Sequence, residues 1–226
     1  SVIMWSTGNE VGEQYTGDAG VLVAQRIHEI TKDEDPTRPT AASFNFAKAH
    51  MPLTGVMDTV TLNYQGEGIR NAPAYAHLKG INTPPVYPDF RKAHPGKIII
   101  SSENAAAVST RGEYLFPVAA GISAPVEDGK GGDPFGSSAD KVLGSLARHS
   151  FVAGGFIWSG WDYLGEPTPY YSARSSYFGV IDLAGFPKDR FYIYQAAWRP
   201  DLPMVHIFPH WNWPERVGKV TPVHIT

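Results

Sequence analysis

Two glutamates in this chain each follow a run of residues typical of a buried β-strand. Glu10 comes after the apolar residues 2–5 and the small polar residues 6–9, which we expect to end the strand. Glu103 follows the β-branched run 98–100 and two serines in the same way. Because the carboxyl ends of parallel strands meet at one face of a barrel, the two carboxyl groups are expected to lie close together. Paired carboxyl groups of this kind indicate acid/base and nucleophilic work on a glycosidic bond.

The first of these stretches also has a purely structural interpretation. Asn9 or Thr7 would cap a helix whose first turn contains Glu10 and Glu13. That stretch alone does not decide between a cap and a catalytic carboxylate, and the second strand-end glutamate favours catalysis. In the catalytic interpretation, the Asn9 amide lies beside the proton donor and offers a hydrogen bond to a substrate hydroxyl.

Other aromatic and acidic residues follow predicted strands further along the chain. Tyr64 ends one strand and Trp158 lies near the carboxyl end of another, where the active-site groups of a parallel barrel lie. A tyrosine at the rim and a tryptophan in the barrel core are the plain structural alternatives. Asp162 and Glu166 come in the next loop, where acids meet sugar hydroxyls or are simply solvated.

The elements that would position these residues alternate between strands and helices. Residues 66–95 and 121–138, rich in Gly and Pro, are expected to be loops, the first with short helices at 74–78 and 89–94. Asp18 is expected to cap the first long helix. The predicted helices are residues 19–32, 140–151 and 190–198, and the predicted strands are residues 2–5, 40–43, 57–64, 97–100 and 155–159, with a tight turn at 184–185.

Composition favours a globular protein that acts on neutral substrates. The 226 residues are 42% hydrophobic, and the formal net charge is −3 without any basic cluster, so neither nucleic acid nor an anionic membrane is expected as a partner. Cysteine is absent, which excludes disulfides and thiolate metal sites and leaves the compartment open. No apolar run is long enough to predict a transmembrane helix.

No metal or cofactor is expected. His77 and His94 have no further ligands at metal-binding spacing, so packing or solvated histidines are the better interpretation. Calcium is conceivable at Glu127, Asp128 and Asp133, but these acids do not follow the EF-hand pattern, and a solvated loop is favoured.

Three segments together resemble glycoside hydrolase family 2. Residues 5–10 (WSTGNE) and the strand that ends at Glu103 resemble the acid/base and nucleophile motifs on strands four and seven of that family's barrel. Residues 154–170 resemble the eighth strand and the following loop of the β-galactosidase branch. The resemblance implies an α/β fold, a partial (β/α)8 TIM barrel holding strands 4 to 8 in residues 1–202, and the start of a following β-sandwich in residues 203–226.

The resemblance further implies a retaining hydrolase that cleaves terminal β-galactosides through a covalent glycosyl-enzyme intermediate. Glu10 would be the acid/base catalyst and Glu103 the nucleophile. The implied substrate-binding residues are Asn9 at the sugar 2-hydroxyl, Tyr64 beside the nucleophile, Trp158 as the apolar floor, and Asp162 and Glu166 at other hydroxyls.

Two departures leave the sugar open. Ala106 stands where some family members carry a histidine three residues after the nucleophile, and the Asn-x-Lys signature of the glucuronidase branch does not occur in these residues. A β-galactoside is therefore the favoured substrate, and other neutral β-glycosides are the alternatives. A non-catalytic carbohydrate-binding half barrel is the alternative from another class. Residues 154–170 disfavour barrel families such as endo-mannanases and cellulases.

The strand count predicts that this domain needs a further piece. Five of eight barrel strands leave two open edges, one of them at the apolar strand 2–5. We expect a longer polypeptide or a partner chain to supply the missing strands, and we expect residues 1–226 alone to be insoluble or inactive.

Overall fold

The chain forms two compact units in the computed structural model, which describes residues 2–65, 85–114, 137, 139–165, 172–221 and 223–226. The first unit comprises residues 1–71, 75–104 and 144–156, and the second comprises residues 72–74, 105–143 and 157–226. None of the points that divide the two units falls at residue 203, and the assignment of residues 203–226 to a separate domain stays a prediction.

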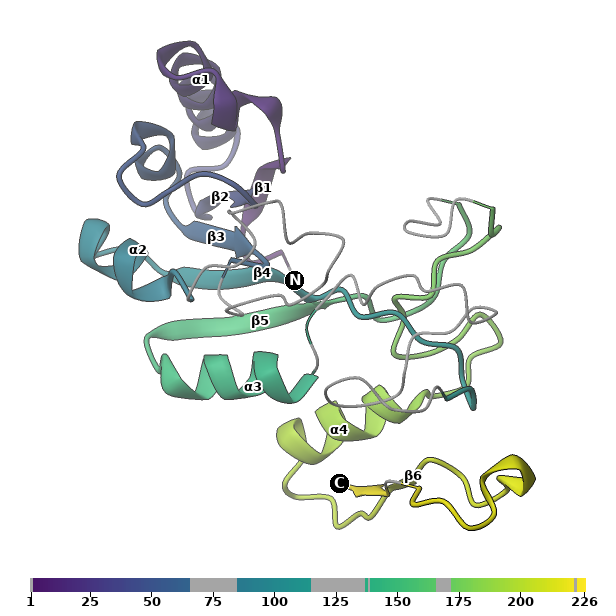
Figure 1. Ribbon diagram of the computed structural model, residues 1–226. Coiled ribbons are helices and arrows are strands. Elements are labelled where there is room, and N and C mark those ends of the chain that lie inside the picture. The colour runs from purple at the N-terminus through teal and green to yellow at the C-terminus, as the bar shows by residue number, and fades with distance from the viewer. Residues whose placement is uncertain (1, 66–84, 115–136, 138, 166–171, 222) are drawn as a thin grey trace. The chain divides into compact units, whose positions relative to one another are not determined.

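A five-stranded parallel sheet dominates the first unit (Figure 1). Its strands lie in chain order, β1-β2-β3-β4-β5, as expected for successive βα repeats. The predicted α/β class is thereby confirmed. The strands are β1 (Trp5–Asn9), β2 (Thr40–Phe44), β3 (Val60–Asn63), β4 (Ile99–Ala105) and β5 (Val152–Trp158), of which the last two residues belong to the second unit.

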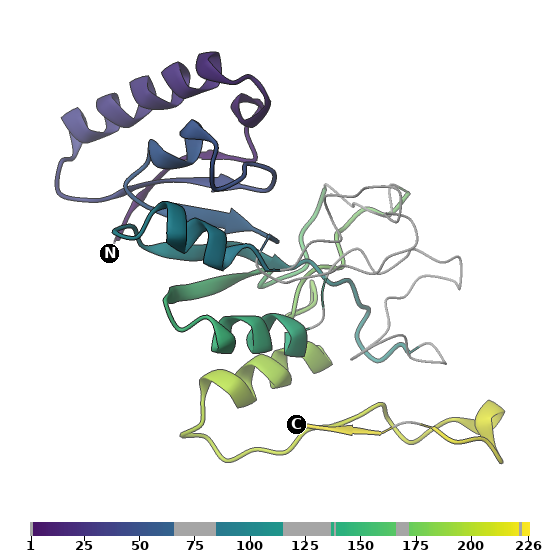
Figure 2. The same ribbon diagram turned by 60° about the vertical axis from the view of Figure 1, so that its left-hand side comes forward.

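Helices connect these strands. Helix α1 (Asp18–Glu34) follows β1 and packs on β1, β2 and the short 3-10 helix η2 (Pro52–Gly55), as Figure 2 shows. Helix α2 (Tyr87–Ala93) precedes β4, and α3 (Ala139–Arg148) precedes β5. Among the described residues, no helix has the length and apolar character needed to cross a bilayer.

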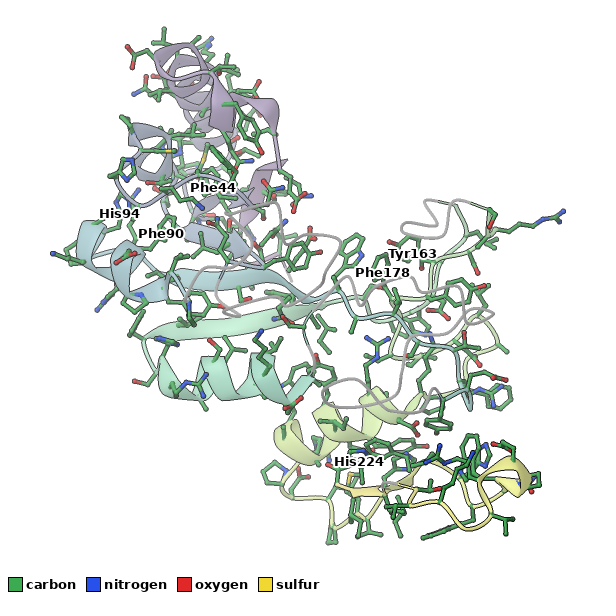
Figure 3. All side chains as sticks on the ribbon, in the orientation of Figure 1. Phe44, Phe90, His94, Tyr163, Phe178 and His224 are labelled. Carbon is green, nitrogen blue, oxygen red and sulfur yellow. The ribbon has the colours of Figure 1, made fainter. Side chains whose placement is uncertain are left out.

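Alternate residues of the strands build the core of the first unit. Phe44 and Leu62 are buried there with Phe90 of α2, and Figure 3 labels Phe44 and Phe90. Each fully buried large apolar side chain contributes about 1.5–3 kcal/mol. Because strand side chains alternate between faces, Asn63, the neighbour of Leu62 in β3, points to the other face of the sheet. Asn63 is a buried polar residue in a strand whose neighbouring side chain, Leu62, belongs to the apolar core.

The position of the first strand differs from the sequence prediction. The predicted strand at 2–5 was to be buried and ended by residues 6–9, but β1 is Trp5–Asn9, and Val2 and Ile3 are 48% and 68% exposed. Pairing begins at Trp5, whose N–H donates to Pro39 O, because β2 starts only after that proline. The small polar residues therefore belong to the strand.

Other boundaries shift by a few residues. Gly17, with φ +59°, is the residue before α1, so Asp18 lies in the first turn and does not cap the helix. The predicted strand 97–100 is β4, which continues to Ala105 and therefore contains Glu103. The helix 74–78, His77, the acids Glu127, Asp128 and Asp133, and Glu166 lie outside the described residues.

The second unit contains helix α4 (Asp189–Trp198) and a small antiparallel sheet of β6 (Ile207–Phe208) and β7 (His224–Ile225). Between the two sheet strands lies the 3-10 helix η4 (Pro214–Arg216). The tight turn at 184–185 is confirmed, since Gly185 has φ +86° and the Asp182 carboxylate accepts the N–H of Ala184 at 2.9 Å. The small sheet agrees with the change of pattern after residue 203. Its role as the start of a β-sandwich stays a prediction.

Candidate active site

Glu10 and Tyr64 each stand immediately after a strand, in a backbone conformation that is unusual for residues other than glycine. Their φ angles are +50° and +60°. The Glu10 N–H donates to Ser43 O at 2.9 Å, and the Tyr64 N–H donates to Glu103 O at 2.8 Å. Such left-handed residues cost on the order of 1–3 kcal/mol and concentrate at functional sites. The backbone hydrogen bonds to neighbouring strands therefore hold both residues at the carboxyl end of the sheet.

Glu103 lies in β4, where it is in register with Asn63 of β3. The Tyr64 hydroxyl donates to Glu103 Oε2 at 2.5 Å. Glu103 and Tyr64 are both only half-buried, so the carboxylate remains accessible while it is hydrogen-bonded. Tyr64 thus lies where the family resemblance implied, next to the carboxylate of Glu103.

Asn63 connects the two glutamates. Its side-chain amide nitrogen lies 2.9 Å from Asn9 Oδ1 and 2.9 Å from Glu10 Oε1. The Ser102 hydroxyl donates to Asn63 Oδ1 at 2.7 Å, which fixes the orientation of the amide. Asn63 is fully buried, so these hydrogen bonds satisfy a polar group that would otherwise be costly to bury.

The electrostatics of the site centre on Glu103. Burial raises the pKa of Glu103 above its ordinary value, and the negative charge of Glu10 raises it further. Hydrogen bonds from Tyr64, Asn63 and Asn9 act in the opposite direction and lower this pKa. The two carboxyl groups are therefore close enough for the charge of Glu10 to influence Glu103.

Four predicted site residues thus lie in one hydrogen-bonded cluster at the ends of β1, β3 and β4, namely Asn9, Glu10, Tyr64 and Glu103. Their individual roles stay predictions. Asn63 and Ser102 were not predicted from the sequence as site residues. The signal available for Asn63 was a polar residue one position before a strand-end tyrosine, in a strand whose other side chains are buried.

Trp158 and Asp162 belong to the second unit, and their contribution to the site stays a prediction. Trp158 is the last residue of β5, with its ring 5.8 Å from the Tyr163 ring in an edge-on contact. The peptide bond between Trp158 and Ser159 is cis.

Asp162 has a clear structural role in that unit. Its carboxylate accepts the Gly179 N–H at 2.8 Å and forms an ion pair with Lys188 at 2.8 Å, and its side chain is only 8% exposed. Lys188 also donates to Ser109 O at 2.6 Å. The buried pair ties the loop after β5 to the segment before α4, which leaves little of Asp162 free for a ligand.

His94, weighed above as a metal ligand, contacts a neighbouring side chain. Its Nε2 lies 2.9 Å from the Thr54 hydroxyl. Within the part of the chain that the structure describes, no three histidine, cysteine or acidic side chains gather closely enough to hold a metal ion.

No family model matches the sequence. Among curated proteins, the β-galactosidase BoGH2A of Bacteroides ovatus is 34% identical over 260 residues, which cover 94% of this chain and 28% of that protein. A putative β-glucuronidase of Formosa agariphila is 39% identical over 92 residues, which cover 39% of this chain and 9% of that protein.

Solved structures of glycosidases also match nearly the whole of this chain with a fraction of their own length. The crystal structure of a β-glycosidase from Bacteroides vulgatus has a TM-score of 0.68 and 27% identity, covering 99% of this chain and 29% of that one. The chain therefore spans less than a third of the length of the relatives it matches.

Proposed function

The chain belongs to glycoside hydrolase family 2, and from this premise we propose that the protein is a retaining β-galactosidase in which Glu10 is the acid/base catalyst and Glu103 is the nucleophile. Because the chain spans only part of its relatives, this activity is proposed for the complete polypeptide that carries these residues.

The observation that carries the proposal is the hydrogen-bond network around Asn63. This amide of β3 holds Glu10, and the adjacent Tyr64 holds Glu103, so two consecutive residues at the carboxyl end of β3 hydrogen-bond both carboxyl groups. A retaining mechanism requires a separation of about 5–5.5 Å between the carboxyl groups, and we expect this separation in the complete enzyme.

The first step forms a covalent intermediate. A carboxylate oxygen of Glu103 attacks the anomeric carbon, the bond from that carbon to the glycosidic oxygen breaks, and Glu10 gives its proton to the departing oxygen. Tyr64 favours the ionised form of Glu103 before the attack. Asn9, which Asn63 positions, would bond the sugar 2-hydroxyl, a contact that strengthens in the transition state.

The second step releases the sugar. Glu10, now a carboxylate, takes a proton from water, and the water oxygen attacks the anomeric carbon. The ester bond to Glu103 breaks at the same carbon, which restores the ionised nucleophile and the protonated acid. Two inversions at one carbon give overall retention.

A mechanism-based label tests this assignment. A 2-deoxy-2-fluoro-β-galactoside with a dinitrophenyl leaving group should give a burst of one phenolate per enzyme and a mass increase on the peptide that contains Glu103. Glu103→Gln should abolish both, whereas Glu13→Gln, which changes a glutamate in the segment after β1, serves as the matched control. An unlabelled enzyme, as in a carbohydrate-binding protein, or a label on another residue would refute the proposal.

A β-glucuronidase is the second candidate. The reason is that one relative, the Formosa agariphila protein described as a putative β-glucuronidase, is 39% identical to this chain over 92 residues. The lack of an Asn-x-Lys sequence in these 226 residues favours the galactoside. Comparing kcat/KM for 4-nitrophenyl β-galactoside and β-glucuronide decides between them. A preference for the glucuronide would change the sugar and leave the assignment of Glu103 intact.

A further inference from the structure

Two aromatic residues in the first unit are exposed side by side. The rings of Tyr15 and Phe46 lie 4.4 Å apart between centroids and are tilted by 34°. The side chains of Tyr15 and Phe46 are 61% and 38% exposed, whereas Phe44, Tyr87 and Phe90 in the same unit are at most 1% exposed. A paired aromatic surface open to solvent is a candidate binding surface.

This aromatic pair follows the carboxyl ends of β1 and β2, and Glu10 also follows β1. Tyr15 ends the 3-10 helix η1 (Gly12–Tyr15), which begins two residues after Glu10, and Phe46 comes two residues after β2. The Glu10 N–H is bonded to Ser43 O, three residues before Phe46. Three residues span at most about 10 Å, so the backbone at Phe46 lies close to the Ser43 carbonyl that accepts the Glu10 N–H.

A buried glutamine holds the two segments together. Gln14, 5% exposed, donates from Nε2 to Val11 O at 3.1 Å and to Asn45 Oδ1 at 3.0 Å. Its Oε1 accepts the N–H groups of Phe46 and Ala47, both at 3.1 Å. Both donors and both acceptor sites of this amide are used. The aromatic pair is therefore pre-organised, which lowers the entropic cost of binding a ring.

Lys48 supplies a polar group at the border of the pair. Its Nζ lies 5.5 Å from the centroid of the Phe46 ring and donates to Gln65 Oε1 at 3.2 Å. An ammonium group has three donors, so it can bond a ligand hydroxyl as well.

We propose that Tyr15 and Phe46 form a leaving-group subsite, on which the ring attached to the glycosidic oxygen stacks, with Lys48 donating to a hydroxyl of that ring. The inference rests on the proposed function, because the leaving group starts at the oxygen that Glu10 protonates. The ligand is a six-membered ring with an apolar face, either a second sugar or an aryl group.

Kinetics with three leaving groups on one sugar tests the subsite in the complete polypeptide. The substrates are a β-galactosyl disaccharide, 4-nitrophenyl β-galactoside and β-galactosyl fluoride, whose leaving group is too small to stack. Phe46→Ala and Tyr15→Ala should each lower the ratio of kcat/KM for the ring-bearing substrate to that for the fluoride by about three- to tenfold, as expected for an aromatic stacking contact. A drop confined to the disaccharide identifies a sugar as the occupant, and one confined to the nitrophenyl substrate identifies an aryl group.

Trp5→Ala is the matched control. Trp5 is also exposed, at 39%, but it begins β1 at the opposite end of the strand from Glu10. An unchanged ratio in Phe46→Ala and Tyr15→Ala, or the same drop in Trp5→Ala, would overturn the subsite. Failure of the proposed function looks different, because the unmodified enzyme would then neither hydrolyse the fluoride nor be labelled at Glu103.

Discussion

Tyr64 is the residue whose substitution should show most directly how a hydrogen bond lowers the pKa of Glu103. Its hydroxyl donates to Glu103 at 2.5 Å and lowers the pKa of that carboxyl group. Tyr64→Phe should raise this pKa further. Because the proposed nucleophile would act as the carboxylate, the acid limb of the kcat/KM profile should move to higher pH.

At neutral pH, kcat/KM in Tyr64→Phe should fall about 10- to 100-fold, which corresponds to one hydrogen bond to a charged group. A pH profile with an activated aryl galactoside measures both effects. Tyr192→Phe is the control, since the Tyr192 ring stacks on His206 at 3.9 Å in the second unit. An acid limb that stays in place would contradict the role of Tyr64.

Asn63 should matter for positioning more than for binding. Asn63→Ala removes the amide that holds Asn9 and Glu10, so kcat should fall about 10- to 100-fold. Ser102→Ala leaves the amide in place and removes only its orienting partner, so its loss should be smaller, about two- to tenfold. Single-turnover rates on the aryl substrate check this order, and equal rates in both variants and the unmodified enzyme would refute it.

Residue types and positions were enough to predict most of the cluster. Asn9, Glu10, Tyr64 and Glu103 were identified because polar groups at successive strand ends meet in a parallel sheet. Asn63 was missed because a buried strand position normally predicts an apolar packing role. The left-handed backbone at Glu10 and Tyr64 was also not predictable, since no glycine marks either position.

At the scale of elements, Gly179 controls how the loop after β5 closes on the segment before α4. A Cβ atom at Gly179 would lie 2.0 Å from Asp162 N and 2.4 Å from Ile181 O, and neither backbone atom can move independently. Gly179→Ala should therefore lower the free energy of unfolding by about 1–3 kcal/mol.

Gly160→Ala is the matched control, because no atom lies within 4 Å of a Cβ at that position. Denaturant melts of both variants measure the difference. Equal midpoints would show that the loop adapts to the added methyl group.

The elements themselves were predictable where the apolar period was clear, as in α1 and α3, and less so where pairing decided the boundary. The strand predicted at residues 2–5 was displaced to Trp5–Asn9 because a strand begins where its partner begins. Likewise β4 extends through Glu103, since pairing with β3 continues at Asn63 despite a shift of register. Hydrogen-bond partners from distant parts of the sequence carry this information, and local propensity does not.

At the scale of the molecule, the parallel sheet ends at β1, which the described residues pair on one side only. Val2 and Ile3 beside that edge and Trp5 in β1 are all exposed, which favours association between copies. Residues 1–226 expressed alone should therefore aggregate or lack galactosidase activity. Mass in solution and aryl-galactoside turnover test this. A soluble, active monomer would refute the prediction that residues 1–226 need further barrel strands.

The α/β class and the family were predictable because three motifs occur in the right order along the chain. The division into two units was not, since it depends on contacts between residues 105–143 and 157–226 that lie far apart in sequence. In that unit the buried Arg190 donates to Ser109 Oγ at 3.1 Å and to Gly179 O at 3.1 Å. No local pattern marks an arginine as the centre of a core.

The backbone bond from Tyr64 N–H to Glu103 O has a consequence for observing the enzyme. An amide hydrogen exchanges with solvent only when its bond opens, and this hydrogen opens only when β3 separates from the strand that carries the proposed nucleophile. The Glu10 amide, bonded to Ser43 O, reports in the same way on β1 and β2. Deuterium uptake at these two amides thus follows the assembly of the strand ends that carry the proposed catalytic residues, without any substrate, label or turnover.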